Sequence, residues 1–335
     1  MQFNSIHLNM LLQLLGWWLL LTSPLALAAE FNVAASIKPV HSLVAGVMQG
    51  IGEPKLLVQG GASPHDYHLK PSDTRSLNAA QVVFWIGPDL ETFLVKPLNN
   101  LKAKVRSVAL MEVPGVTILP LREGGAWESH QHHHEKPHGH EEHQHGKQQD
   151  QDSKHEHDDP DGSHDAHIWL DPVNAIAMVH QIVTVLSEMD AAHQPVYQRN
   201  GARLIEQLNQ LHQQLGVELA PLKNQPYIVF HDAYQYFEQR YGLNAVGSVV
   251  LSPEQRPGAK RVAEIQARIR DRKARCVFSE PQFQPALVET VIAGTSARRG
   301  VLDPEGGTEL TAGPDAYFQL LQKLSSSLRT CLSNS

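Results

Sequence analysis

The stretch that most constrains the fold is a short apolar run that ends abruptly at a histidine. Residues 227–230 read Tyr-Ile-Val-Phe, His231 follows at once, and helical spacing begins directly after it. A short run of β-branched and aromatic residues without polar alternation is typical of a buried strand in a parallel sheet. Because open α/β sheets bind ligands outside the carboxyl ends of their strands, His231 is expected to face a binding crevice.

Strands and helices alternate through most of the chain. Predicted strands lie at residues 33–37, 55–58, 82–86, 107–110, 227–230, 245–251, 276–279 and 300–302, and a last helix covers 315–332. This alternation predicts βαβ units and parallel sheets, hence an α/β protein. A length of 335 residues is too great for one ordinary core and indicates two domains.

One predicted helix between these two halves is unusually long. From Pro195 onward, apolar residues recur at helical spacing for roughly seven turns, ending near Leu219. Two interpretations remain open, a stiff connector between two α/β units or an ordinary surface helix of one domain.

The N-terminus resembles an export signal. An apolar stretch at residues 11–21 is short for a membrane span, and Ala26-Leu27-Ala28 fits a signal-peptidase site. We therefore predict a cleaved signal peptide at residues 1–28, with an uncleaved anchor as the alternative. The first ten residues lack Lys and Arg, which departs from the usual signal.

The chain has two cysteines, Cys276 and Cys331. An even number in an exported chain predicts one disulfide, here between a strand and the last helix. The alternative is two unpaired buried thiols. A net charge of −7 without a basic stripe argues against nucleic acid as a partner.

The alternation of strands and helices collapses between residues 124 and 164. This stretch has almost no residues that could form a core, so we predict a disordered loop that interrupts a domain. Its composition predicts weak metal binding, and a soluble linker without a role is the alternative. The eleven histidines are His130, His132, His133, His134, His138, His140, His143, His145, His155, His157 and His164.

Two further histidines are candidates to join His231 in one crevice. His65 lies in a Gly-rich loop after a strand, and His167 precedes an apolar Trp-Leu pair that would anchor it. A single histidine is more often structural than a ligand. Three neutral imidazoles converging on one point would form a zinc site with an open fourth position. His68 is a weaker rival of His65, because it lies nearer the next helix.

Two carboxylates also follow strands and are candidates to complete this site. Glu280 follows the strand at 276–279, and Asp303 follows the strand at 300–302. Each could be a fourth ligand or could orient an imidazole. Each also precedes a proline, so a role as a turn or cap residue is the alternative.

Five motifs in this order resemble the ZnuA family, the periplasmic zinc-binding components of bacterial zinc ABC importers, within the metal-specific solute-binding proteins. The motifs are His65-Asp-Tyr, His167-Ile-Trp-Leu-Asp-Pro, Phe230-His231-Asp-Ala-Tyr, Phe278-Ser-Glu280-Pro-Gln-Phe and Leu302-Asp303-Pro. The resemblance covers nearly the whole mature chain. It includes the place of the histidine-rich insertion and of the cysteine pair, which forms a disulfide in such proteins.

The resemblance implies two lobes, each a four-stranded mostly parallel sheet with flanking helices, joined by one long rigid helix. The N-terminal lobe would span residues 29–194 with the loop at 124–164. The linker helix would span 195–220, and the C-terminal lobe 221–335. Metal would bind between the lobes.

The resemblance also implies His65, His167 and His231 as zinc ligands. Manganese-binding relatives have a carboxylate where His231 stands, which favours zinc. Some zinc-binding members have Glu directly before the first ligand, where this chain has Pro64. The fourth ligand is therefore expected to be Asp303 or water, with Glu280 orienting an imidazole.

These features predict a monomeric periplasmic carrier, not an enzyme, that captures Zn²⁺ and delivers it to the membrane permease of an ABC importer. No P-loop pattern occurs, so no nucleotide is expected on this chain. A zinc hydrolase with three histidines and water is the alternative from another class. A zinc buffer that acts through the histidine-rich loop alone is a third.

Overall fold

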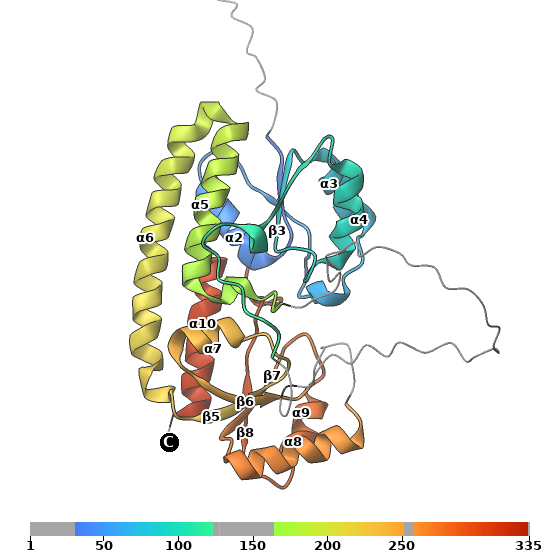
Figure 1. Cartoon of the computed structure of the whole chain (residues 1–335), viewed down its shortest axis with the longest axis vertical. Helices are drawn as coiled ribbons and strands as arrows, with labels where there is room; N and C mark the ends of the chain where they lie inside the picture. The colour runs from blue at the N-terminus through green and yellow to red at the C-terminus, as the bar shows by residue number, and fades with distance from the viewer. Residues whose placement is uncertain (1–30, 123–126, 128–163, 251–256, 334–335) are drawn as a thin grey trace, which may run out of the picture. The chain divides into compact units, whose positions relative to one another are not determined.

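The computed structural model describes residues 31–122, 127, 164–250 and 257–333. Residues 32 onward belong to one compact unit, which contains two four-stranded sheets (Figure 1). The predicted signal peptide and all but two residues of the predicted histidine-rich loop lie outside the described residues. Among the described helices, none combines the length and apolar character needed to cross a membrane.

The first sheet has the strand order β2-β1-β3-β4, and all its pairings are parallel. Its strands are β1 (Val33–Ala35), β2 (Lys55–Leu56), β3 (Val82–Trp85) and β4 (Arg106–Ala109). Its helices are α2 (Lys38–Met48), α3 (Pro71–Ala79) and α4 (Thr92–Leu101). The central strands β1 and β3 are buried throughout, which explains their continuous apolar sequences.

The second sheet has the strand order β6-β5-β7-β8 and is also parallel throughout. Its strands are β5 (Pro226–Val229), β6 (Asn244–Ser248), β7 (Cys276–Ser279) and β8 (Arg298–Val301). Its helices are α7 (Gln235–Tyr241), α8 (Ala259–Arg272) and α9 (Ala286–Ile292). The predicted fold class of two four-stranded α/β sheets is confirmed. The edge strand β8 begins earlier than predicted, because its first two residues are exposed arginines that an apolar pattern misses.

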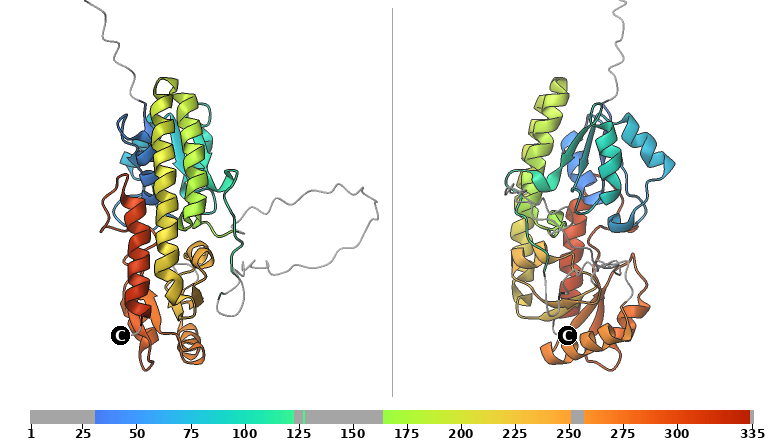
Figure 2. Two further views of the ribbon diagram at one scale, coloured as in Figure 1. Left: turned by 90° about the vertical axis from the view of Figure 1, so that its left-hand side faces the viewer. Right: turned by 45° about the vertical axis from the view of Figure 1, so that its right-hand side comes forward.

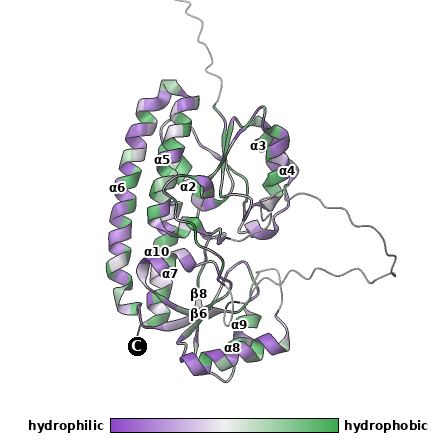
Figure 3. Ribbon diagram, viewed as in Figure 1, coloured by the Kyte–Doolittle hydropathy of each residue, from purple (hydrophilic) through white to green (hydrophobic). Residues whose placement is uncertain are grey.

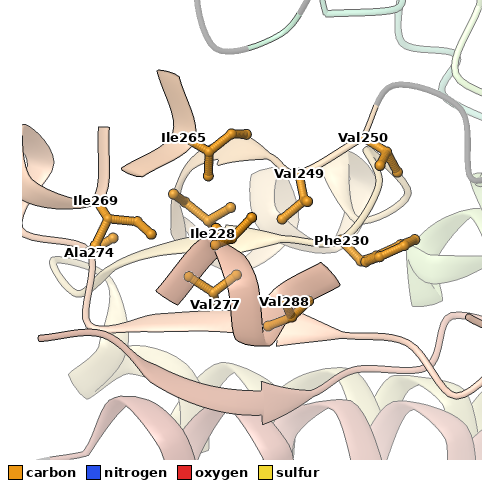
Figure 4. Packing of buried hydrophobic residues seen from close by; sticks show 10 residues of the cluster. Ile228, Phe230, Val249, Val250, Ile265, Ile269, Ala274, Val277 and Val288 are labelled. Atoms are coloured by element: carbon orange, nitrogen blue, oxygen red, sulfur yellow. The ribbon is translucent and has the colours of Figure 1, made fainter. Parts of the chain in front are cut away.

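The core of the second sheet lies between its strands and the helices α8 and α9. Ile228 of β5 and Val277 of β7 are fully buried against Ile265 and Ile269 of α8 and Val288 of α9 (Figure 4). Hydrophobic and hydrophilic colours alternate along α8 in Figure 3, as expected for a helix with one buried stripe. This core fixes the strand β5, whose carboxyl end leads to His231.

A helical layer connects the two sheets. Helix α5 (Pro172–Met189) packs along α6 (Gln194–Leu219), whose 26 residues correspond to about 39 Å of length. Helix α6 packs against α2 of the first sheet and also against α7 of the second, and Figure 2 shows it running beside α5 and α10. The helix thus has the length and contacts of a connector, while the domain boundaries remain a prediction.

The last helix, α10 (Ala316–Leu332), returns to the beginning of the chain. It packs against α2 and α6, and the Tyr317 amide donates to Ser42 Oγ at 2.9 Å. The Tyr317 hydroxyl donates to the Trp169 carbonyl at 2.7 Å. Near its end, Cys331 forms a disulfide with Cys276 of β7, so the predicted pairing is confirmed.

Candidate metal centre

His65 lies on the loop that connects β2 of the first sheet to α3. It sits in a 3₁₀ turn, Pro64–Asp66, where Ser63 Oγ accepts a hydrogen bond from the His65 amide at 3.3 Å. Gly61 has φ +73°, and a Cβ there would lie 3.3 Å or less from backbone atoms of Gly307 and Thr308. Glycine therefore lets this loop cross directly against the loop that follows β8.

His167 lies just before a 3₁₀ turn, Ile168–Leu170, that leads into α5. The Asp165 carboxylate accepts from the His167 amide at 3.0 Å and lies 2.7 Å from its Nδ1. Trp169 is fully buried and donates from Nε1 to the Pro304 carbonyl at 2.8 Å. These contacts fix the imidazole with Nδ1 toward the carboxylate and Nε2 away from it.

His231 follows β5 and is 4% exposed. Glu280, which follows the neighbouring strand β7, places its two carboxylate oxygens 2.7 and 2.8 Å from His231 Nδ1. A hydrogen on Nδ1 satisfies this carboxylate and leaves a lone pair on Nε2. The adjacent parallel strands thus supply both the imidazole and the group that orients it.

The three imidazoles converge on one point. His65 Nε2 lies 3.2 Å and His231 Nε2 3.4 Å from His167 Nε2, and candidate ligand atoms of the three lie within 4.8 Å of one another. Two nitrogens bound to tetrahedral zinc at about 2.0–2.1 Å are about 3.3–3.4 Å apart. With the Nδ1 hydrogens directed at Asp165 and Glu280, the Nε2 lone pairs of neutral His167 and His231 would face each other, a repulsion that a bound cation would relieve.

Burial and neighbouring groups tune the protonation of these histidines. Burial lowers the pKa of His65 and of His167 well below the usual value, and the neighbouring histidines lower it further. Burial acts most strongly and lowers the pKa of His231, but the carboxylates of Glu280, Asp232 and Asp165 together outweigh burial and raise that pKa. Burial raises the pKa of Asp165 to about 7. His65 and His167 are therefore neutral and ready to bind a cation at neutral pH, while a proton competes at His231.

The other predicted site residues lie in different surroundings. Among the described residues, the cluster that could hold a metal ion contains the three histidines and not Asp303 or His68. Asp303 Oδ1 accepts from Gln282 Nε2 at 2.8 Å and from the amides of Glu305 and Gly306 at 3.0 and 2.9 Å. These bonds hold Asp303 through Oδ1, and Asp303 as a fourth ligand stays a prediction.

The sequence reasoning missed two groups beside the cluster. Asp165, two residues before His167, could have been noticed from the Asp-x-His spacing, because a carboxylate there can reach the ring. Arg122, which contacts Asp232 and Glu238, gives no local signal because its partners are more than 100 residues away. The predicted histidines of the loop lie outside the described residues, except His164.

Two parallel α/β sheets connected by a long helix, with three imidazoles converging on one point, define a metal-specific solute-binding protein. The sequence model of the family "Zinc-uptake complex component A periplasmic" (ZnuA) matches residues 33–331. The chain belongs to this family.

Curated relatives agree with this assignment. The "High-affinity zinc uptake system protein ZnuA" of Brucella suis is 50% identical over 307 residues, covering 90% of this chain and 92% of its own length. The protein of the same name from Yersinia pestis is 37% identical over 326 residues, with 93% and 96% coverage.

Solved structures share the fold. A crystal structure of ZnuA matches with a TM-score of 0.70 at 22% identity, covering 90% of this chain and 99% of the other. The laminin-binding protein Lmb of Streptococcus agalactiae, described as an adhesin with metal transporting activity, matches with a TM-score of 0.70 at 19% identity and covers 90% of this chain.

Proposed function

We propose that this protein is the periplasmic zinc-binding component of an ABC importer, with Zn²⁺ as its cargo. The observation that carries the proposal is the convergence of the Nε2 atoms of His65, His167 and His231 at spacings of 3.2 and 3.4 Å. These spacings match those of nitrogens around a tetrahedral zinc ion. The names of the relatives from Brucella suis and Yersinia pestis support the same cargo.

An all-imidazole donor set favours zinc over the harder cations. Mg²⁺, Ca²⁺ and Mn²⁺ prefer oxygen ligands, whereas imidazole suits Zn²⁺. The two carboxylates that hold the rings, Asp165 and Glu280, also supply negative charge near the ion. They offset the charge of a dication among neutral ligands without occupying a coordination position.

The fourth position is proposed to hold water, with Asp303 as the protein candidate. Water is supported because Asp303 lies outside the cluster of converging ligand atoms and is held through Oδ1 by three hydrogen bonds. An Asp303→Ala variant should then keep its zinc affinity. A fall of severalfold or more would instead support direct ligation by Asp303.

The remaining assignments follow the proposed function. A signal peptide at residues 1–28 would direct export, and lobes at 29–194 and 221–335 would flank the helix at 195–220. The family supports a membrane permease as partner, and we propose that the carrier acts as a monomer without nucleotide.

The contacts around the cluster favour a carrier over a zinc hydrolase. A hydrolase needs a carboxylate or another base free to activate water. Among the described residues, Asp165 and Glu280 are each directed at an imidazole Nδ1. A buffer acting through the histidine-rich insertion alone would not need the buried cluster.

Metal content and affinity of the mature protein test the proposal. Purified protein and a His231→Ala variant are stripped of metal and titrated with Zn²⁺ in a calorimeter, with bound metal counted by mass spectrometry. The matched control is His193→Ala, which removes a histidine whose side chain is 47% exposed and outside the cluster. We expect one tight site in the wild type and the control, and its loss in His231→Ala. Tight zinc binding that survives in His231→Ala would refute the assignment.

A further inference from the structure

Two short segments that flank the insertion pair with each other beside the metal cluster. Pro120 and His164 form an antiparallel bridge, and the Asp165 amide donates to the Leu119 carbonyl at 2.9 Å. We call residues 119–122 together with 164–165 the clip. One segment follows the first sheet, and the other ends two residues before the candidate ligand His167.

The clip packs against α7, the helix that connects β5 and β6 of the second sheet. The Tyr236 hydroxyl accepts from the Leu119 amide at 2.9 Å and donates to the Asp165 carbonyl at 2.7 Å. With its amide nitrogen turned toward the clip, Gln235 donates to Asp165 Oδ2 and to the Pro120 carbonyl at 3.0 and 3.2 Å. One helix of the second sheet thus holds both segments of the clip.

Arg122, the last residue of the first clip segment, contacts Asp232, which directly follows His231. Its Nε donates to Asp232 Oδ2 at 2.9 Å, and its Nη2 donates to Asp232 Oδ1. Its Nη1 donates to Glu238 Oε2 at 2.8 Å, and the guanidinium lies 3.5 Å from the centre of the Trp127 ring. The fork geometry fixes both the position and the direction of the Asp232 side chain.

We propose that Arg122 is a positioning residue for the metal centre, acting on His231 through Asp232 while the same clip holds His167 through Asp165. The inference rests on the proposed zinc function and extends it to a residue that touches no metal. One end of the clip contains Asp165, which contacts the His167 ring, and the other contains Arg122, which contacts Asp232 beside His231. The clip therefore links the supports of His167 and His231, in addition to the contacts of Trp169 and Glu280.

The charges explain why arginine is needed here. Glu238 is 4% exposed, and the Asp232 and Arg122 side chains are 19% and 20% exposed. Without the guanidinium, two neighbouring carboxylates would share a poorly hydrated space, which strongly favours a rearrangement. Asp232 adjoins His231 in sequence, so its movement displaces the imidazole from its present distance to His167.

The test compares Arg122→Gln with a matched arginine. Arg240 also forms a two-point pair across the molecule, with 2.8 and 2.6 Å contacts to Asp171, but Asp171 adjoins no candidate ligand. Zinc affinity is measured by competition with a chelator, and site geometry by the visible absorption spectrum of the Co²⁺-loaded protein. We expect Arg122→Gln to weaken zinc binding about 10- to 100-fold, as for other groups that orient ligands, and to change the Co²⁺ spectrum. Arg240→Gln should change neither.

Further variants separate positioning from loss of the fold. Arg122→Lys keeps the charge without the fork and should restore part of the affinity. In the Asp232→Asn background, Arg122→Gln should have a much smaller effect than in the wild type, because the partner through which it acts is already neutral. Circular dichroism of the metal-free proteins checks that each variant is folded, and if Arg122→Gln is not, Arg122→Lys and Asp232→Asn carry the test.

The outcomes distinguish this inference from the proposed function. If the wild type binds no zinc tightly, the proposed function fails. If the wild type binds zinc and Arg122→Gln keeps its affinity and spectrum, only the positioning role fails. Equal losses in Arg122→Gln and Arg240→Gln also overturn that role, since they would reflect general loosening between the sheets. A loss of zinc affinity in Arg122→Gln but not in Arg240→Gln supports the positioning role of Arg122.

Discussion

Replacing Glu280 with Gln removes the charge that holds His231 while keeping the size of the side chain. Glu280 is 2% exposed, and both its oxygens lie within 2.8 Å of His231 Nδ1. A zinc ion on the far nitrogen of the ring would lie about 6–7 Å from this carboxylate, given a Zn–N bond of about 2.0 Å. At an effective dielectric constant of about 20, attraction between the two charges amounts to about 5 kcal/mol.

The measured effect should be smaller than this attraction. In the metal-free protein the same carboxylate stabilises a proton on His231, whose pKa it raises against the opposing effect of burial. Removing the carboxylate therefore weakens zinc and its competitor together. We expect Glu280→Gln to lower zinc affinity about 10- to 100-fold at pH 7.5, or about 1.4–2.7 kcal/mol.

Although Glu280→Gln should lower zinc affinity, it should also make that affinity depend less on pH. In the wild type, zinc binding weakens as pH falls through the raised pKa of His231, because the proton occupies the site. In Glu280→Gln that pKa falls, so acidification from about pH 7.5 to about pH 6 should reduce affinity less than in the wild type.

Chelator competition at these two pH values measures both effects. Glu289→Gln is the matched control, because Glu289 pairs with Arg299 on the surface at 3.0 Å and its side chain is 60% exposed. An unchanged affinity at pH 7.5, or an equal pH dependence in the two proteins, would refute the role given to Glu280.

Three further perturbations test other parts of the structure. His167→Ala should abolish tight zinc binding while circular dichroism stays unchanged, and an equal affinity would remove His167 from the ligand set. Deleting residues 129–163, which spares His164 of the clip, should preserve one tight calorimetric event and remove weaker ones. Histidines of a loop predicted to be disordered must lose conformational entropy to bind metal, and loss of the tight event would contradict this division. Cys331→Ala should lower the free energy of unfolding by about 4 kcal/mol, since the disulfide with Cys276 closes a long loop. Denaturant titration of this variant and of a Cys276→Ala/Cys331→Ala double variant shows whether the effect comes from loss of the disulfide.

Much of the fold could be predicted because buried parallel strands are apolar along their whole length. The segment at 82–86 was predicted as a strand for this reason and forms β3 (Val82–Trp85). The predicted strand at 276–279 coincides with β7. The exposed edge strand β8 was placed less accurately, because two of its four residues are arginines.

The candidate site was predictable only in part. His231 could be assigned to a crevice because it directly follows a buried strand. Glu280 could also be predicted to orient an imidazole, because it follows a strand. Which imidazole it reaches, and the pairing of Arg122 with Asp232, depend on contacts between distant segments. Local sequence patterns carry no information on such distances. The hydrogen bonds of Asp303 to its own loop are those of a turn residue, the alternative that the following proline had indicated.

The return of α10 to α2 has a consequence for the order of synthesis. The segment that contains Tyr317 is synthesised long after both of its partners, Ser42 and Trp169. Because Trp169 follows a candidate ligand by two residues, a nascent chain without α10 lacks part of the support for its metal centre. The centre therefore gains its full support only after α10 has been synthesised and has packed against α2.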